Sequence, residues 1–250
     1  MMVHPSLKDM STSHIRALRQ YLVHYRGREG HASRPFHALN ASAAATIAQV
    51  SIGLLRQQLR DTDRVHTVLR DAGGAVNVIL RRATIECMVR ADALAEVDSV
   101  WRRVEKCMEA GALESGVEIL VEGPTFGMGD FHYDEPLATM FKSNAERFGR
   151  TSPEYTDQMV GSTDMADISA VFPAFHPMLS YGLPPECGAR TAAFADASGG
   201  PEGDWFIADA GLAMAHTISE LLLSPIARAG SIERRPGPGS VAVISNLLRI

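Results

Sequence analysis

Residues 41–59 read ASAAATIAQVSIGLLRQQL, and the secondary structure of this stretch determines how the flanking segments are assigned to helices and strands. Its larger apolar side chains recur at the 3.6-residue spacing of one helix face. These side chains are Ile47, Val50, Leu54 and Leu55. Asn40 or Ser42 can cap the first turn with a side-chain oxygen. The pattern predicts a helix that turns this stripe toward a core.

Alternating, β-rich segments surround this helix. IRALRQYLVHY (15–25) reads as a strand that ends at a glycine, and RVHTVLRDAGG (64–74) and VNVILRRATIECMVRA (76–91) read as two strands with a glycine turn between them. A second amphipathic helix follows, ending at Gly116, and VEILVEG (117–123) is the last strand. The apolar stripe that this second helix is expected to turn inward consists of Val97, Val100, Trp101, Val104 and Met108. The order β, α, β, β, α, β predicts a split βαβ, ferredoxin-like sandwich over residues 13–122.

Residues 123–250 differ from the preceding segment in their pattern of predicted helices and strands. Two helical segments, PLATMFKSNAERFG and WFIADAGLAMAHTISELLLSPIARAG, enclose a stretch rich in glycine, proline and short β-like pieces. Helices and isolated strands without partners predict a layer of a larger α/β body. The final residues, which follow a proline and glycine break, are expected to be loosely ordered.

Composition excludes several classes of function. The chain of 250 residues is 46% hydrophobic and 21% charged, with a formal net charge of -5, so nothing indicates a nucleic-acid partner. Its apolar stretches are broken by charge or proline, which predicts no membrane helix, and the N-terminus does not resemble a secretory signal. Three cysteines without CxxC spacing favour reduced thiols in the cytoplasm.

Familiar catalytic motifs are absent, since the sequence holds no GxxxxGK[ST], GxGxxG after a strand, HExxH or GxSxG. His31 stands on a glycine-flanked loop before a helix, where an imidazole could contact a developing oxyanion or a carboxylate. A solvated loop histidine explains the same pattern. Asp164, Asp167 and His176 could lie together in a loop-rich region, although such residues also make turns and caps.

Several motifs, taken in order along the chain, resemble the aminoacylase and carboxypeptidase family of zinc-dependent amidohydrolases, in its aminobenzoyl-glutamate hydrolase-like branch. They are GREGHAS with the later NA of Asn40 and Ala41, AGGAVNVI, ATIECMVRA, and GSTDMADIS followed by FP. The resemblance implies an α/β catalytic domain with an inserted ferredoxin-like lid that mediates dimerisation. Residues 1–12 would then be a remnant of the catalytic domain, 13–122 the lid, and 123–250 the rest of the catalytic domain.

The resemblance also implies roles for particular residues. His31 matches the lid histidine that helps hold the carbonyl oxygen in the transition state, typically in the partner subunit's active site. Asn77 matches an asparagine that contacts the carboxylate end of the substrate, although Leu80 stands where proline is usual. Arg90 is a second candidate for that contact, and His176 is counted with the substrate-binding residues. A small amide substrate and a homodimer through the lid are therefore expected.

A divalent metal, zinc or manganese, is implied in the same way, and His4 in MVHP matches one of the family's ligands. The other family ligands and the general-base glutamate mostly precede this point, so we expect an N-terminally truncated member of the family. The last ligand, a histidine, aligns with Arg190, whose guanidinium stays protonated and is no ordinary metal ligand.

Three functional hypotheses follow. The first is a metal-dependent amidohydrolase that cleaves small N-acyl amino acids, aminobenzoyl-glutamate or dipeptide-like substrates. The second is a truncated, non-catalytic homologue that serves as a dimerising or binding module. The third is an unrelated α+β protein that binds a small molecule. Metal content together with hydrolytic activity distinguishes the first two.

Overall fold

A computed structural model describes residues 1–11, 13–151 and 161–225. The chain forms two compact units. We call Arg16–Asp130 the sheet unit. The other, which we call the helical unit, combines Met1–Ile15 with the described residues from Phe131 onward.

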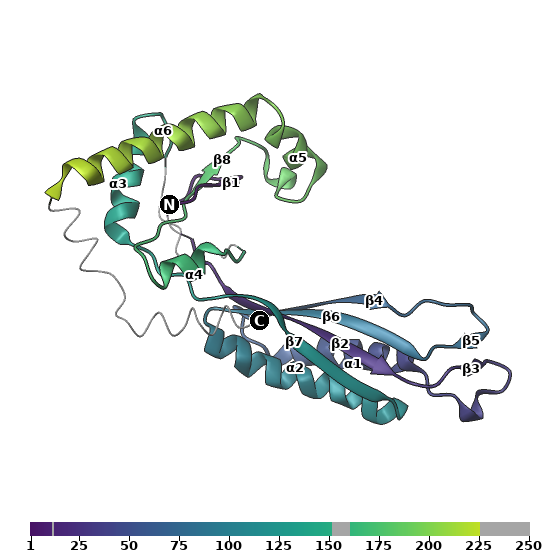
Figure 1. The fold of residues 1–250 in the computed structure, drawn as a ribbon. Helices are drawn as coiled ribbons and strands as arrows, with labels where there is room; N and C mark the ends of the chain where they lie inside the picture. The colour runs from purple at the N-terminus through teal and green to yellow at the C-terminus, as the bar shows by residue number, and fades with distance from the viewer. Residues whose placement is uncertain (12, 152–160, 226–250) are drawn as a thin grey trace. The chain divides into compact units, whose positions relative to one another are not determined.

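The sheet unit is a four-stranded antiparallel sheet with two helices on one face (Figure 1). The strands are β2 (Ala17–Arg26), β4 (Arg64–Asp71), β6 (Arg82–Ala91) and β7 (Glu118–Met128), and their order across the sheet is β4-β6-β2-β7. The helices are α1 (Ala41–Leu55), continued by the 3-10 turn η2 (Arg56–Gln58), and α2 (Leu94–Ser115). This order is that of the split βαβ sandwich, so the predicted ferredoxin-like fold is confirmed.

Helix α1 forms where predicted, and the side chain of its N-cap Asn40 accepts a hydrogen bond from the Ser42 amide. The predicted inward stripe is wrong, because Val50 and Leu54 are 59% and 62% exposed. The buried side of α1 consists instead of small residues and one isoleucine, namely Ala41, Ala44, Ala45, Ala48 and Ile52.

The cause lies in α2, where Gly111 lets the two helix backbones approach closely. A Cβ at Gly111 would lie 2.3 Å from the carbonyl oxygen of Ala44 and 3.2 Å from the amide nitrogen of Ala48. At that separation only small side chains fit between the helices, so the larger residues of α1 point outward.

Helix α2 buries the stripe that its sequence predicts, from Val97 to Met108. Trp101 stacks on Tyr21 of β2 with ring centroids 3.5 Å apart, and the hydroxyl of Tyr25 donates to the Met108 carbonyl at 3.1 Å. The helix ends at Gly116 in the left-handed conformation, with φ of 65°. These contacts join α2 to the centre of the sheet.

Two strands differ from their predicted extent. The alternating segment 76–91 is not one strand: β5 (Val78–Ile79) leaves the main sheet and pairs with β3 (Gly30–His31), and only β6 continues in the sheet. Strand β7 runs beyond residue 122 to Met128, past an irregularity in its pairing with β2 between Gln20 and Leu22.

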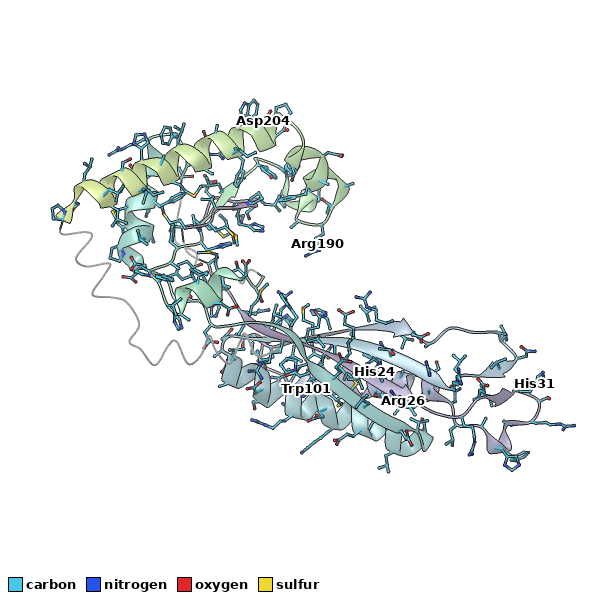
Figure 2. All side chains as sticks on the ribbon, in the orientation of Figure 1. His24, Arg26, His31, Trp101, Arg190 and Asp204 are labelled. Carbon is cyan, nitrogen blue, oxygen red and sulfur yellow. The ribbon has the colours of Figure 1, made fainter. Side chains whose placement is uncertain are left out.

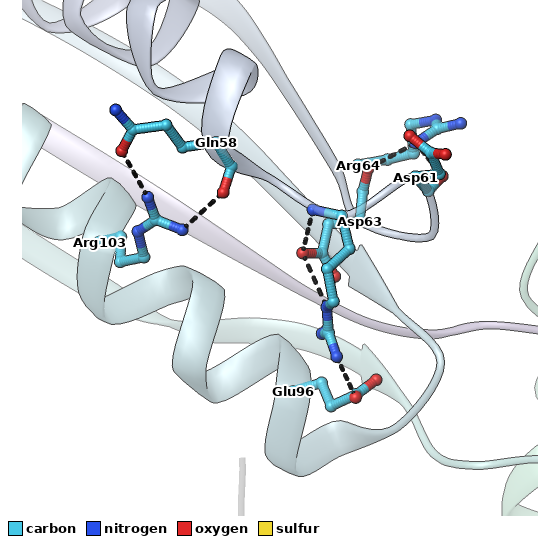
Figure 3. A network of polar contacts seen from close by, with 7 residues as sticks. Gln58, Asp61, Asp63, Arg64, Glu96 and Arg103 are labelled. Atoms are coloured by element: carbon cyan, nitrogen blue, oxygen red, sulfur yellow. Dashed lines mark hydrogen bonds and ion pairs between the residues drawn. The ribbon is translucent and has the colours of Figure 1, made fainter.

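Charged side chains tie the end of α1 to α2 (Figure 3). Arg60 forms ion pairs with Asp63 at 2.9 Å and with Glu96 on α2. Arg103 of α2 donates to the backbone and side-chain oxygens of Gln58 at 3.0 and 3.2 Å. The ion pair of Arg60 with Glu96 contributes little to stability, because these side chains are 50% and 33% exposed. Asp63 is 3% exposed, and its bonds to Arg60 fix the loop that enters β4.

The helical unit has little sheet. Its strands β1 (His4–Ser6) and β8 (Met178–Ser180) form one parallel pair, and α3 (Glu135–Glu146), α4 (Met165–Ser169), α5 (Ala192–Ser198) and α6 (Pro201–Leu223) surround it, with the 3-10 turn η3 (Pro185–Cys187). Its core packs Phe141 of α3 against Phe175, with ring centroids 5.3 Å apart, and includes Leu179 and Phe206.

Helix α6 is long and apolar enough to cross a membrane by length and composition alone, with a mean hydropathy of 1.3 and 22% of that stretch buried. A single helix of this kind is weak evidence, since core helices of other proteins pass the same test. Polar groups on its inner side bind the rest of the unit: Asp209 forms an ion pair with Arg150 at 2.8 Å, and Glu220 accepts from Asn144 at 3.1 Å. The expectation of no membrane helix therefore stays a prediction.

Candidate functional site

The pairing of β3 with β5 brings His31 and Asn77 together at one exposed end of the sheet unit. Figure 2 shows His31 at the end away from Trp101. The Ala32 amide donates to the Asn77 carbonyl at 2.9 Å, and the Asn77 side-chain nitrogen lies 3.5 Å from Nε2 of His31. Two side chains 46 positions apart in the sequence thus lie within hydrogen-bonding distance of each other at this exposed end.

The surroundings of this pair are unusual for an exposed loop. Phe36, on the 3-10 turn η1 (Pro35–His37), is 94% exposed, and Val76 is fully exposed. The edge of the His31 ring opposite Asn77 contacts Ser33: Nδ1 of His31 lies 2.8 Å from the Ser33 hydroxyl oxygen and 3.2 Å from the Ser33 amide nitrogen. The Ser33 contact was not predicted, and the only sequence signal for it is a hydroxyl two residues after the histidine.

Arg90 lies elsewhere in the sheet unit. It pairs across the sheet with Leu18 of β2 and Arg64 of β4, whereas the start of β6, at Arg82, pairs with Arg26 next to the β3 loop. Arg90 lies eight positions beyond Arg82 on the same strand, a distance of about 26 Å at the usual rise per residue. Within one chain, the structure does not bring Arg90 to the His31–Asn77 pair.

His176 lies in the helical unit and is buried, with 2% of its surface exposed. The pKa of its imidazole is lowered to about 4, mainly by burial and then by the neighbouring His4, whereas Asp164 acts in the opposite direction. Nδ1 of His176 has no hydrogen-bond partner among the described residues. The imidazole is therefore neutral at neutral pH.

His4 opens strand β1, with its ring centroid 5.9 Å from that of His176 and its Nδ1 2.6 Å from the Pro5 carbonyl oxygen. It lines a largely apolar cavity of about 460 Å³ beside Leu7, Met178 and Phe194. Arg190, which stands in place of a family ligand, is exposed and adopts a left-handed backbone with φ of 74°.

These residues do not make a metal site. A hydrolytic metal needs about three protein ligands, and no three His, Cys, Asp or Glu side chains cluster in the part of the chain that the structure describes. His4 and His176 form at most a pair. A divalent metal therefore does not fit the described residues.

Comparison with known proteins identifies the sheet unit. Residues 14–115 match the family model of the M20 peptidase dimerisation domain. Residues 14–115 therefore resemble an M20 peptidase dimerisation domain. Peptidases of the M20 type usually use divalent metals.

Two curated relatives agree with this assignment. The chain is 28% identical over 231 residues to a Xaa-Arg dipeptidase from Homo sapiens, and 25% identical over 228 residues to one from Mus musculus. Both alignments cover 90% of this chain and 52% of the relative. The chain therefore spans about half the length of the curated relatives that it matches.

Solved structures of similar fold also match this chain. An aminobenzoyl-glutamate utilization protein from Klebsiella pneumoniae superposes with a TM-score of 0.60 at 16% identity, over 86% of this chain and 53% of that chain. An amidase of the hydantoinase/carbamoylase family from Burkholderia vietnamiensis gives 0.64 at 15% identity, over 84% and 49%.

Proposed function

We propose that the chain acts in hydrolysis of the amide bond of a small N-acyl amino acid, aminobenzoyl-glutamate or dipeptide-like substrate. The observation that carries this proposal is the meeting of His31 and Asn77 at the β3–β5 end of an M20-type dimerisation domain. The relatives supply the substrate class, since they include a Xaa-Arg dipeptidase and an aminobenzoyl-glutamate utilization protein.

In this proposal, Nε2 of His31 and the amide of Asn77 contact oxygens of the substrate. As the scissile carbonyl becomes tetrahedral its oxygen gains negative charge, and a hydrogen-bond donor fixed near that oxygen stabilises the transition state. Zinc or manganese remains the proposed cofactor of the family chemistry, but the described residues do not fit a metal, so we derive no step through it. Arg90, His176 and His4 keep their family-based assignments as proposals.

The alternative of a non-catalytic dimerising or binding module is not favoured, because the relatives are peptidases and amidases. The cytoplasm stays the proposed location because the three cysteines are dispersed and free. A nucleic-acid or membrane partner is not proposed, on the grounds of net charge and interrupted apolar stretches.

A panel of substrates tests the proposed activity. Purified protein would be incubated with Zn²⁺, Mn²⁺ or Co²⁺ and with aminobenzoyl-glutamate, Ala-Arg, Lys-Arg and an N-acetyl amino acid, and release of the free amine followed by chromatography. Metal-dependent cleavage of at least one member supports the proposal. Absence of cleavage with every metal and substrate would contradict it.

A homodimer through the sheet unit is the second part of the proposal. The dimerisation-domain match makes a second copy the expected partner. Among the described strands β4 pairs only with β6, so its other edge is open to pair with a strand. Beside that edge, α1 exposes Val50 and Leu54, and β4 itself exposes Val68 and Leu69. We propose that these four side chains and the β4 edge form the dimer interface.

Sedimentation velocity at micromolar concentration tests this interface. A Val50→Glu/Leu54→Glu double variant places two like charges on each copy at the proposed contact, which should convert a dimer to a monomer. Leu113→Glu is the matched control, because Leu113 on α2 is 85% exposed and lies outside the proposed interface. A monomeric parent protein, or a double variant that stays dimeric, would refute the interface.

A further inference from the structure

A second cavity in the helical unit has polar walls and lies where the C-terminal ends of α3 and α6 meet. Its volume is about 420 Å³. Asn144 and Arg147 line it from the end of α3, and His216, Glu220 and Leu223 line it from α6. None of these residues takes part in the proposed hydrolysis, so that function does not account for the cavity.

Asn144 is the buried member of this wall, with 1% of its surface exposed. Its Nδ2 donates to the Met140 carbonyl at 3.0 Å and to the Thr217 hydroxyl at 3.3 Å. The Thr217 hydroxyl can accept this bond because its own proton goes to the Ala213 carbonyl at 2.7 Å. Nδ2 also donates to Oε2 of Glu220 at 3.1 Å, which holds that carboxylate at the edge of the cavity.

Three groups around the cavity lack partners. Oδ1 of Asn144 is buried and accepts no hydrogen bond from the described residues. Buried amide oxygens nearly always accept one, so this oxygen indicates a donor that those residues do not supply. Within 1–11, 13–151 and 161–225, Glu220 forms no ion pair, and the Arg147 side chain forms neither an ion pair nor a hydrogen bond. One cavity thus carries a carboxylate and a guanidinium that do not pair with each other.

These groups complement a ligand that carries both charges. An ammonium group has three N–H donors and no acceptor, which suits the Glu220 carboxylate and Oδ1 of Asn144. A guanidinium binds a carboxylate through two parallel hydrogen bonds, which suits Arg147. An α-amino acid has an ammonium and a carboxylate on one carbon atom. The cavity volume of about 420 Å³ lies within the range of roughly 300–1,000 Å³ that is usual for small-molecule sites.

We propose that this cavity binds a free α-amino acid, with Glu220 and Asn144 holding its ammonium group and Arg147 holding its carboxylate. The apolar side chain of Leu223 lines the space left for the side chain of the ligand. The site goes beyond the proposed function, because binding here requires neither a metal nor turnover of an amide.

Saturation-transfer difference NMR of the full chain, without metal, tests the site with three small probes. L-Alanine carries both charges, L-alaninamide lacks the carboxylate, and N-acetyl-L-alanine lacks the ammonium. L-Alanine should bind saturably with a Kd in roughly the millimolar range. Each analogue should bind about tenfold more weakly or worse, because each loses one charged hydrogen-bonding group.

Arg147→Gln and Glu220→Gln should each weaken binding of L-alanine by about tenfold. Both side chains are exposed, so both variants should fold. Lys142→Gln is the matched control, because Lys142 lies on α3 but does not line the cavity, and it should leave binding unchanged.

Absence of saturable L-alanine binding would overturn the proposal, and so would unchanged binding in both Arg147→Gln and Glu220→Gln. Equal binding of L-alanine and L-alaninamide would indicate a site for a cation alone and would also overturn it. These outcomes are independent of the substrate panel, since the measurement involves no metal and no hydrolysis.

Discussion

Replacing Gly111 with alanine tests the close approach of α1 and α2. The new Cβ would lie 2.3 Å from the Ala44 carbonyl oxygen and 3.2 Å from the Ala48 amide nitrogen, and neither backbone atom can rotate away. Overpacking of this kind costs about 1–3 kcal/mol, and the short contact puts Gly111 at the upper end. Alanine returns about 1 kcal/mol as the better helix former. We expect the free energy of unfolding to fall by about 2 kcal/mol.

Gly53→Ala is the matched control, because Gly53 lies on α1 with nothing within 4 Å of an added Cβ. That change should raise the free energy of unfolding by about 0.5–1 kcal/mol. Urea unfolding followed by Trp101 fluorescence in a Trp205→Phe background reports on the sheet unit. If both substitutions stabilise the protein equally, the described separation of α1 and α2 is wrong.

Three further outcomes concern the helical unit. The pKa of His176 is about 4 in the folded protein against an ordinary 6.5, so the unfolded state binds an additional proton as the pH falls below 6.5. Urea unfolding should therefore show that the free energy of unfolding falls by about 2 kcal/mol between pH 7 and pH 5. His176→Gln should remove this pH dependence, and an equally steep dependence in the variant would contradict the prediction. Arg190 has φ of 74°, so Arg190→Gly should raise the unfolding free energy by up to about 1 kcal/mol in chemical denaturation, while a loss would argue against a strained backbone. Leu212 and Leu222 on α6 are 46% and 59% exposed and offer apolar surface to solvent. The double variant Leu212→Gln/Leu222→Gln should therefore bind less of an apolar fluorescent dye than the control Leu113→Gln does. Equal dye binding by the two variants would argue against an apolar surface at these two leucines.

Helix periodicity predicted both helices of the sheet unit but only one of the buried faces. On α2 the large apolar side chains are the buried ones, so the stripe from Val97 to Met108 was correctly predicted. On α1 the contact with Gly111 admits only small residues, and side-chain size is then a misleading signal for burial. The departure of β5 from the main sheet depends on pairing with β3, a long-range contact that local alternation does not encode.

The candidate site followed from the resemblance more than from local pattern. A histidine on a glycine-flanked loop has no specific signal by composition, and nothing in the spacing of His31 and Asn77 predicts their contact across 46 residues. The order of motifs along the chain supplied both residues. The Ser33 contact required the turn geometry, because it depends on a backbone amide that every non-proline residue possesses.

We propose that the sheet unit supplies His31 as a hydrogen-bond donor for amide hydrolysis. The most direct test is kcat/KM of the purified protein on its best substrate, compared between the parent, His31→Ala and His37→Ala. Loss of one transition-state donor should lower kcat/KM by about 10²–10³-fold in His31→Ala. His37→Ala, on the same exposed loop, should leave it unchanged. Equal rates in all three proteins would show that His31 takes no part in catalysis.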